Sequence, residues 1–321
     1  MATLIERLRW IRREALGLNR RNQDYLLRWN RPALVGLVDH KVRTKEVLAA
    51  LGLPVPETFA SYKRQRQLLA LRAEIERRSQ FVLKPACGAG GEGVVVVAGR
   101  RGDRFVKASG ATLSSADIVA QAADIIAGAF SLSQARDEAL LEDRLAPDAV
   151  LGAYSPGGIP DIRVLIVRGI PLMAMLRLPT TLSDGRANLH VGGVGVGIDM
   201  ATGRAVHAIW RNVPIVSHPD TKQPLSALQV PHWESVLLLA ARSYAAVPLG
   251  YMGVDIVIDH ERGPMILELN ARPGLAIQLA NHRGLRRILE AVEKRPVDGL
   301  GPEARIELGL DLAGAHSDFR K

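Results

Sequence analysis

The most informative part of the chain is the segment Gly253-Val-Asp-Ile-Val-Ile-Asp-His-Glu-Arg-Gly-Pro-Met-Ile-Leu-Glu-Leu-Asn270. Two apolar runs flank a short polar loop in this segment, and the pattern predicts an antiparallel β-hairpin. The residues expected on its apolar face are Val254, Ile256, Ile258, Met265, Leu267 and Leu269. If the apolar faces of the two strands coincide, residue 259 pairs with residue 264, and Asp255 lies directly opposite Glu268.

The polar face of this hairpin is a candidate metal site. Two carboxylates that face each other across a pair of strands repel one another. A hard divalent cation bound by Asp255, Glu268 and the amide oxygen of Asn270 would turn this repulsion into attraction, and magnesium prefers such oxygen ligands. A solvated outer face with ordinary charged residues is the alternative. The Gly253 flank and the turn over residues 270–274 favour the metal site.

A glycine-rich loop is the second informative feature, within Phe81-Val-Leu-Lys-Pro-Ala-Cys-Gly-Ala-Gly-Gly-Glu-Gly-Val-Val-Val-Val97. Backbone N–H groups of such a loop can close on phosphate oxygens, and Lys84 at the end of the preceding strand can add a positive charge. No Lys-Ser/Thr pair follows, and the loop enters a strand, which excludes a Walker loop and a dinucleotide fingerprint. A flexible glycine hairpin with an incidental lysine is the alternative.

Several polar residues lie in apolar strands between these two features. Arg163 and Arg177 are predicted in such strands, where an unpaired guanidinium is costly, so each needs a partner or a ligand. Ordinary salt bridges would also satisfy them. The segment Gly193-Val-Gly-Val-Gly-Ile198 alternates glycine with apolar residues. Its bare face predicts that another backbone or a ligand packs closely against it.

Composition narrows the class of protein. The chain has 321 residues, of which 47% are hydrophobic, and this excludes a disordered chain and suggests two domains. Its one cysteine, Cys87, excludes a disulfide scaffold and a cysteine-rich zinc module. Aromatic residues make up only 4%, so we expect no nucleic-acid partner despite the net charge of +9. No apolar run is long enough for a membrane span, and no signal peptide is recognisable.

The predicted organisation is an α+β protein with two lobes. We expect a basic helical segment over residues 1–38, a first lobe with the glycine-rich loop over 39–150, a second lobe with the metal site over 151–295, and a tail over 296–321. The predicted helices are 3–16, 42–51, 62–78, 115–130, 232–246 and 284–294. The predicted strands are 81–84, 94–97, 139–142, 162–168, 171–177, 193–198, 253–258 and 264–269.

Taken in order, these motifs resemble the ATP-grasp superfamily. Within it they are most similar to the RimK-like branch, in particular to alpha-L-glutamate ligase-related proteins. The resemblance covers about residues 17–290. It is carried by Val38-Asp-His-Lys-Val-Arg-Thr-Lys45, Pro160-Asp-Ile-Arg163, Met173-Ala-Met-Leu-Arg-Leu-Pro179, Ala187-Asn-Leu-His190 and Leu267-Glu-Leu-Asn-Ala-Arg-Pro-Gly-Leu-Ala-Ile-Gln278.

This resemblance implies an ATP-grasp fold with the nucleotide between two α+β lobes, and it implies roles for individual residues. The residues similar to the family's ATP-binding positions are Lys41, Lys84, Gly88, Gly90, Gly91, Gly93, Glu142, Asp143, Leu145 and Asp148. Those similar to its phosphate-bracing arginines are Arg163, Arg177 and Arg272, and Asn188 and His190 resemble substrate or phosphate contacts. The magnesium ligands implied are Asp255, Glu268 and Asn270.

The activity implied by the resemblance is an ATP- and Mg²⁺-dependent carboxylate–amine ligation through an acyl phosphate. Two magnesium ions are expected, with Mn²⁺ as the alternative metal, and Cys87 is not required as a nucleophile. The expected substrates are a small carboxylate and amine, or glutamate and a peptide or protein acceptor. The alternatives are an ATP-grasp kinase or sugar-associated modifying enzyme, and a nucleotide-binding regulator without turnover.

The first 31 residues carry eight arginines against three acidic residues. They stand where many ATP-grasp enzymes have a larger domain. A helix packed on the protein body is the simplest interpretation. The alternatives are docking on an acidic protein partner or on an anionic membrane surface. We therefore expect a cytoplasmic protein, with peripheral attachment to the membrane if residues 1–31 bind lipid.

Overall fold

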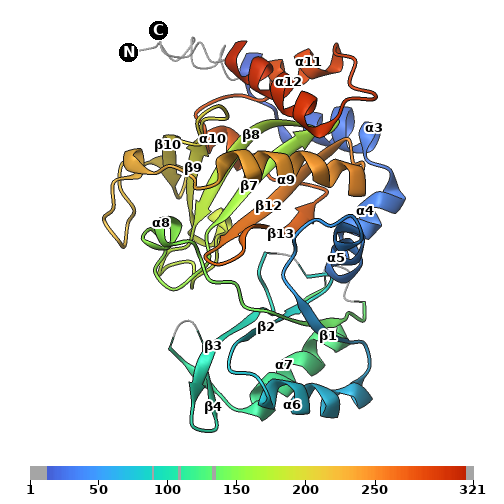
Figure 1. Ribbon diagram of the computed structural model, residues 1–321, viewed down its shortest axis with the longest axis vertical. Helices are drawn as coiled ribbons and strands as arrows, with labels where there is room; N and C mark the ends of the chain where they lie inside the picture. Colours follow the sequence, from blue (N-terminus) through green and yellow to red (C-terminus); the bar gives the residue numbers. More distant parts are fainter. Residues whose placement is uncertain (1–12, 89, 108–109, 132–134, 316–321) are drawn as a thin grey trace.

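The computed structural model describes residues 13–88, 90–107, 110–131 and 135–315, which form two lobes, each built on an antiparallel sheet (Figure 1). The smaller sheet has the order β1-β6-β2-β3-β4-β5 and the larger has the order β11-β10-β9-β8-β7-β12-β13. The strands of the small lobe are β1 (Thr58–Tyr62), β2 (Phe81–Pro85), β3 (Val95–Arg101), β4 (Arg104–Lys107), β5 (Thr112–Leu113) and β6 (Ala139–Glu142). Those of the large lobe are β7 (Asp161–Val167), β8 (Ile170–Leu178), β9 (Val194–Ile198), β10 (Ala205–Trp210), β11 (Val213–Pro214), β12 (Tyr251–Asp259) and β13 (Gly263–Asn270).

The helices flank these sheets. Helices α6 (Leu68–Glu76) and α7 (Ser115–Ala127) belong to the small lobe, and α9 (Trp233–Ala246) lies across the large sheet (Figure 1). The shorter helical segments are α2 (Leu18–Arg20), a π-helix (Arg21–Leu26), α3 (Leu27–Trp29), α4 (Pro32–Val38), a 3₁₀ turn (Gln65–Gln67), α8 (Ala149–Gly152), and 3₁₀ turns at Leu189–Val191 and Leu225–Ala227. The remaining helices are α5 (Lys41–Ala50), α10 (Ala276–Ala280), α11 (Arg286–Glu293) and α12 (Pro302–Ala315).

The small sheet has one apolar and one polar face. Phe81 and Leu83 on β2 join a core with apolar side chains of α6 and α7. Because side chains alternate along a strand, Lys84 lies on the opposite face, with Glu142 of the neighbouring strand β6 on that same face. The helices therefore cover one face and leave the charged face turned toward the large lobe.

In the large lobe, the glycine-alternating strand β9 packs against backbone. A Cβ atom at Gly197 would lie only 2.4 Å from the carbonyl oxygen of Ala280, at the end of α10. At Gly195 a Cβ would meet Leu189 at 2.7 Å. The sequence left open whether a backbone or a ligand packs on this bare face, and the protein places helix α10 there.

Helix α5 bridges the two lobes. Leu48 and the nearby Leu53 are buried in the core of the large lobe. At its other end, the Lys41 N–H group donates a hydrogen bond to the carbonyl of Ala86, just after β2. Helix α5 thus joins the core of the large lobe, while its first half, from Lys41 to Lys45, contacts the small lobe, and the lobe boundary expected at residue 39 stays a prediction.

Residues 13–31 are integrated into the large lobe. Asn30 is buried, and its side-chain amide donates to the carbonyls of Tyr251 and Ala271 while its oxygen accepts the Tyr251 N–H. The Gln278 side chain bonds both backbone groups of Leu16. The expectation that the basic N-terminal segment packs on the protein body is therefore confirmed for residues 13–31. Most of the helix predicted over 3–16 lies outside the described residues. No helix in the described part of the chain is long and apolar enough to cross a membrane.

The other predicted elements agree with the structure except at three places. The helix predicted over 62–78 is wrong at its start, because residues 58–62 form β1 and the α-helix begins at Leu68. The predicted tail contains α12, which packs on β8 and α9. The third difference lies in the hairpin at 253–270 and bears on the site.

Candidate functional site

The hairpin β12–β13 brings together the two predicted carboxylates. Asp255 pairs with Glu268, as expected from the sequence. The predicted pairing of residues 259 and 264 is wrong, because Asp259 pairs with Gly263 and the register shifts beyond Asp255. This β-bulge places Leu267 as an extra residue on β13. As a consequence, Met265 pairs with Val257 on the face of Asp255, and not with the apolar face.

Asp255 is held by two arginines from the neighbouring strands. Arg163 on β7 donates to both of its carboxylate oxygens, at 2.7 and 2.5 Å, and Arg177 on β8 donates to one of them at 2.7 Å. Arg177 also donates to Asp161. All four side chains are buried. Two carboxylates and two guanidinium groups therefore form a network whose formal charges cancel.

The network shifts the pKa values of its two carboxyl groups in opposite directions. Burial opposes ionisation of Asp255, but Arg163 and Arg177 outweigh burial and hold its pKa below the usual range. Burial raises the pKa of Asp161 to about 7, and the neighbouring charge of Asp255 adds to this increase. Arg163 and Arg177 were expected to brace phosphate, and in the protein they pair with carboxylates.

A second buried charge cluster lies on the small lobe. Glu142 of β6 accepts a hydrogen bond from Lys45 of α5 at 2.7 Å and forms an ion pair with Lys84 of β2. Burial would raise the pKa of Glu142, but the two ammonium groups outweigh burial and lower it. Burial also lowers the pKa of Lys45. One carboxylate between two lysines leaves an excess positive charge, which suits an anion.

Sequence reasoning missed Lys45 and chose Lys41. The ammonium group of Lys41 does not bond Glu142 but donates to the carbonyl of Gly88, at the start of the glycine-rich loop. The missed signal is the spacing of four residues between the two lysines, which places both on one side of a helix. Only the tertiary contact with Glu142 distinguishes them.

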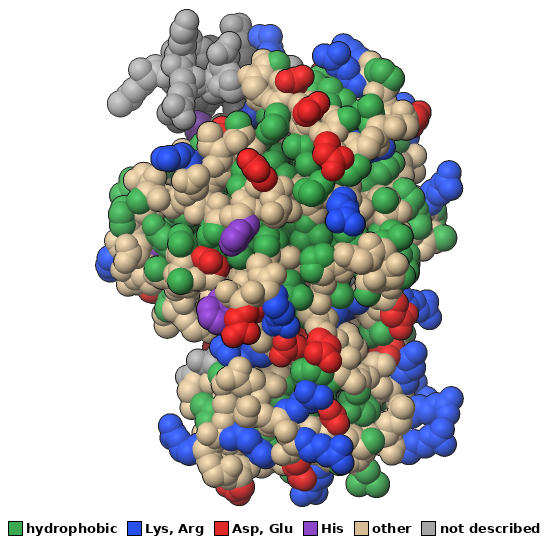
Figure 2. Space-filling model, in the orientation of Figure 1, with side chains coloured by type: hydrophobic (Ala, Val, Ile, Leu, Met, Phe, Trp, Pro, Cys, Tyr) green, Lys and Arg blue, Asp and Glu red, His purple; other side chains and the backbone are tan. Residues whose placement is uncertain are grey.

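A cavity of about 10 Å³, large enough for about one water molecule, lies between α5 and the hairpin. Lys41, Lys45 and Glu268 line it, together with apolar residues of α5 and β13. Figure 2 shows acidic and basic side chains gathered along the waist between the two lobes. The expected phosphate-binding lysine and metal-binding carboxylate are thus brought to one place.

The glycine-rich loop approaches the large lobe near residues 186–188. A Cβ atom at Gly91 would lie 3.0 Å from the side chain of Arg186, and one at Gly90 would lie 3.8 Å from that of Asn188. Gly93 has a φ of +72°, and a Cβ there would lie 2.6 Å from the ring of Phe130. Asn188 caps the turn that carries His190, by accepting the His190 N–H. The loop and both candidate substrate residues therefore share one side of the junction.

The residues predicted to hold adenosine lie at the crossing between the lobes. Asp143 pairs with Arg262 at 2.7 Å, and Leu145 packs with Val257 and Met265 in a small apolar cluster. Asp148 instead caps α8 by accepting the Val150 N–H, so its carboxylate is engaged locally. The Leu145 side chain is therefore buried in this apolar cluster.

Two further predicted residues surround the end of the hairpin. The side-chain oxygen of Asn270 accepts the backbone N–H of Arg272 at 2.9 Å. The guanidinium of Arg272 pairs with Asp39 at 2.5 Å, and both side chains are nearly half exposed. Arg272 is therefore accessible at the junction, whereas Arg163 and Arg177 are buried.

The donors at the hairpin are oxygen atoms, as a hard divalent cation prefers, but Asp255 already accepts hydrogen bonds from two arginines and Asn270 accepts one from the Arg272 N–H. Glu268 faces Asp255 and forms no ion pair with any residue that the structure describes. No group of three or more His, Cys, Asp and Glu within the described ranges could hold a metal by itself. The predicted ligand set of Asp255, Glu268 and Asn270 therefore has only two carboxylates, and Mg²⁺ is commonly held through few protein ligands together with substrate phosphates.

Comparison with known proteins identifies the class. The sequence profile of the sugar-transfer associated ATP-grasp family matches residues 20–294. The chain therefore belongs to this family, and its two-lobed α+β architecture is the ATP-grasp fold. No curated protein matches the sequence.

Similar solved structures include the ATP-grasp ligase PsnB complexed with its minimal precursor, at 16% identity and a TM-score of 0.39, over 88% of this chain and 63% of that one. The D-alanine–D-alanine ligase from Bacillus anthracis is 13% identical, with a TM-score of 0.44, over 89% and 70% of the two chains. The D-cycloserine synthetase DcsG is 17% identical, with a TM-score of 0.42, over 87% and 72%. The chain thus spans less than two thirds of the length of PsnB.

Proposed function

We propose that the protein is an ATP- and Mg²⁺-dependent carboxylate–amine ligase that works through an acyl phosphate. The observation that carries the proposal is the junction between the lobes. There, Lys45 and Lys84 surround Glu142 with excess positive charge, and Lys45 shares a cavity with Glu268 of the hairpin. A cluster that attracts phosphate next to oxygen donors for magnesium is the arrangement that phosphoryl transfer requires.

The chemistry needs no protein nucleophile. A carboxylate substrate attacks the γ-phosphoryl group of ATP, ADP leaves, and an amine then displaces phosphate from the acyl phosphate to form an amide. In this proposal Lys45 and Lys84 hold the phosphates, and the exposed Arg272 neutralises the transferring group. Magnesium, held by Asp255, Glu268 and Asn270, would supply charge neutralisation on the phosphates. Arg163 and Arg177 orient Asp255 by fixing both of its oxygens.

The remaining predicted residues complete this proposal. Glu142, Asp143 and Leu145 would hold the adenosine, and the glycines from 88 to 93 would close on the triphosphate. Asn188 and His190 would contact phosphate or substrate. The RimK-like relationship, glutamate as the donor, and a peptide or protein acceptor rest on the sequence resemblance, and a small amine is the alternative acceptor.

A second candidate is an ATP-grasp enzyme that modifies a sugar-linked acceptor or acts as a kinase. The family description, which associates these proteins with sugar transfer, favours an acceptor of this kind. The phosphoryl group distinguishes the two activities. Ligation releases inorganic phosphate, whereas a kinase leaves the phosphoryl group on its product.

The test is an assay of ATP, Mg²⁺ and a panel of carboxylic acids with amines, peptides and amino sugars. Mass spectrometry detects the adducts, and acids labelled with ¹⁸O report the mechanism. An acyl phosphate requires that one ¹⁸O atom of the acid appear in the released phosphate. The Lys84→Met variant is the control for contaminating activity. A phosphorylated acid or sugar as the final product would show that the protein is a kinase and not a ligase.

A further inference from the structure

Glu138, directly before β6, is a buried carboxylate without hydrogen bonds. Its side chain is 4% exposed, and neither of its oxygens has a hydrogen-bond partner among the described residues. Buried polar groups are almost always satisfied, because each unsatisfied group costs its full desolvation penalty. The proposed activity gives this group no role.

The groups that face Glu138 come close without bonding to it. Nε2 of His40 lies 3.5 Å from Oε2, and Nζ of Lys63 lies 3.4 Å from the same oxygen. These distances exceed those of normal hydrogen bonds. The other ring nitrogen of His40 is also buried and unpartnered within the described part of the chain. The neighbouring Asp137 is already engaged, since it accepts the N–H groups of Cys87 and Glu138.

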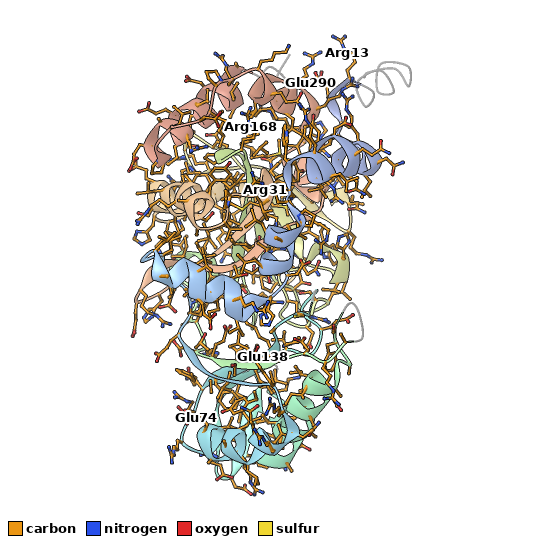
Figure 3. The ribbon with its side chains drawn as sticks, turned by 90° about the vertical axis from the view of Figure 1, so that its right-hand side faces the viewer. Arg13, Arg31, Glu74, Glu138, Arg168 and Glu290 are labelled. Atoms are coloured by element: carbon orange, nitrogen blue, oxygen red, sulfur yellow. The ribbon has the colours of Figure 1, made fainter. Side chains whose placement is uncertain are left out.

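This incomplete contact lies at the end of β6 opposite Glu142. The backbone links the same three segments, since Lys41 N–H donates to Ala86 and Ala86 N–H donates to Glu138, each at 2.9 Å. Figure 3 shows Glu138 at the junction of the lobes, beside helix α5. Helix α5 is therefore attached to both ends of β6. The attachment of Lys45 to Glu142 is complete, and that of His40 to Glu138 is not.

A bound phosphate would change the balance between these attachments. An anion between Lys45 and Lys84 shares their positive charge with Glu142, and this weakens the ion pair of each lysine with Glu142. The attachment of α5 through Lys45 then weakens. The start of α5 then needs a second contact with the small lobe to keep Lys45 in place.

We propose that His40 and Glu138 form this second contact and are positioning residues for nucleotide binding, an inference that rests on the proposed function. The Nε2–H group of His40 closes to a direct hydrogen bond with Glu138 when phosphates occupy the lysine cluster. Lys63, which is 65% exposed, adds charge from the other side. The pair acts on the nucleotide through the placement of α5 and does not touch the phosphates.

The experiment is a double-mutant cycle on nucleotide affinity. Binding of a fluorescent ATP analogue with Mg²⁺ is measured for the wild type, His40→Gln, Glu138→Gln and the double variant. We expect each single variant to raise Kd about tenfold and the double variant to bind as weakly as either single variant. The matched controls are His232→Gln and Glu234→Gln, at exposed positions at the start of α9, which should leave Kd unchanged.

Thermal unfolding of the same variants without nucleotide separates positioning from a merely structural role. A positioning pair lowers nucleotide affinity in variants that melt like the wild type. Independent effects of the two substitutions, or variants that melt earlier but bind like the wild type, would overturn the inference. A wild type that binds no nucleotide would instead overturn the proposed function, and this inference with it.

Discussion

The two lobes neutralise their buried charges in different ways. In the large lobe, Arg163 and Arg177 match Asp255 and Asp161, and the planar guanidinium groups donate three hydrogen bonds to Asp255. In the small lobe, Lys45 and Lys84 share Glu142 alone. The first cluster has no net charge, and the second has an excess of one positive charge. The difference indicates that the small-lobe cluster is the one of the two that is available to an anion.

The largest expected effect is on the large-lobe cluster. Arg177→Met leaves Asp161 without its partner and takes one of the two arginines from Asp255, both in a buried site. We expect the free energy of unfolding to fall by about 3–5 kcal/mol, because removing one member of a buried ion pair leaves an uncompensated charge. Urea denaturation measures the loss. The control is Arg101→Met, at an exposed arginine. An equal fall in the free energy of unfolding there would show that the buried ion pairs are not responsible.

Asp259 extends the comparison to a carboxylate held by one arginine and by backbone N–H groups. It accepts the N–H groups of Ala146, Glu261 and Arg262 and the guanidinium of Arg262. Burial opposes ionisation, but these hydrogen bonds outweigh it and lower the pKa of Asp259 to about 2.

The depressed pKa of Asp259 predicts an acid-dependent loss of stability. Because the folded-state pKa lies below the unfolded value of about 3.9, the contribution of about 2 kcal/mol is present above pH 4 and is lost as the pH falls through 2. Asp259→Asn should therefore be less stable at pH 6 and nearly equal to the wild type at pH 2. Denaturation at several pH values checks this. A difference that stays constant with pH would show that the carboxylate charge is not responsible.

The two lysines of α5 allow a test of which side chain binds the phosphates of ATP. Lys45→Met should weaken binding of ATP at least tenfold, because it removes charge from the cluster. Lys41→Met should have a smaller effect, because Lys41 donates to the carbonyl of Gly88. Titration with a fluorescent nucleotide compares the two variants. If Lys41→Met were the more damaging substitution, the family-based prediction from sequence would be right and the structural argument wrong.

The smallest expected effect is at the metal-binding face. Glu268→Gln removes a carboxylate that faces Asp255, so without Mg²⁺ it should raise the free energy of unfolding by about 0.5 kcal/mol. With nucleotide present, the same variant should lose the stabilisation that Mg²⁺ gives to the wild type. Thermal unfolding with and without Mg²⁺ and nucleotide measures both effects. Unchanged stabilisation by Mg²⁺ would place the metal elsewhere.

Local patterns predict five of the seven strands of the large sheet, and β10 and β11 were not predicted. Alternating apolar residues determine the strands and their faces, and they correctly place Asp255 opposite Glu268. The bulge at Leu267 could not be predicted, because apolar residues stand on both sides of it and the shift reverses the face of Met265. Helix α12 was missed because prolines and glycines precede it, whereas its apolar residues find their partners on β8 and α9.

The charged clusters depend on contacts that are distant in sequence. Glu142 selects Lys45 over Lys41 only because α5 crosses the end of the small sheet, 97 residues away in the chain. Arg163 and Arg177 were recognised as arginines in need of partners, but the choice between phosphate and carboxylate requires the register of three strands. Sequence therefore predicts the residue types of the site better than their pairing.

The most direct measurement is calorimetric titration of the protein with a non-hydrolysable ATP analogue, with and without Mg²⁺. We predict that the wild type binds one nucleotide, more tightly with Mg²⁺, and that Lys45→Met combined with Lys84→Met abolishes binding while the protein stays folded. Wild-type affinity in the folded double variant would contradict the account, because the positively charged cluster around Glu142 would then not hold the phosphates.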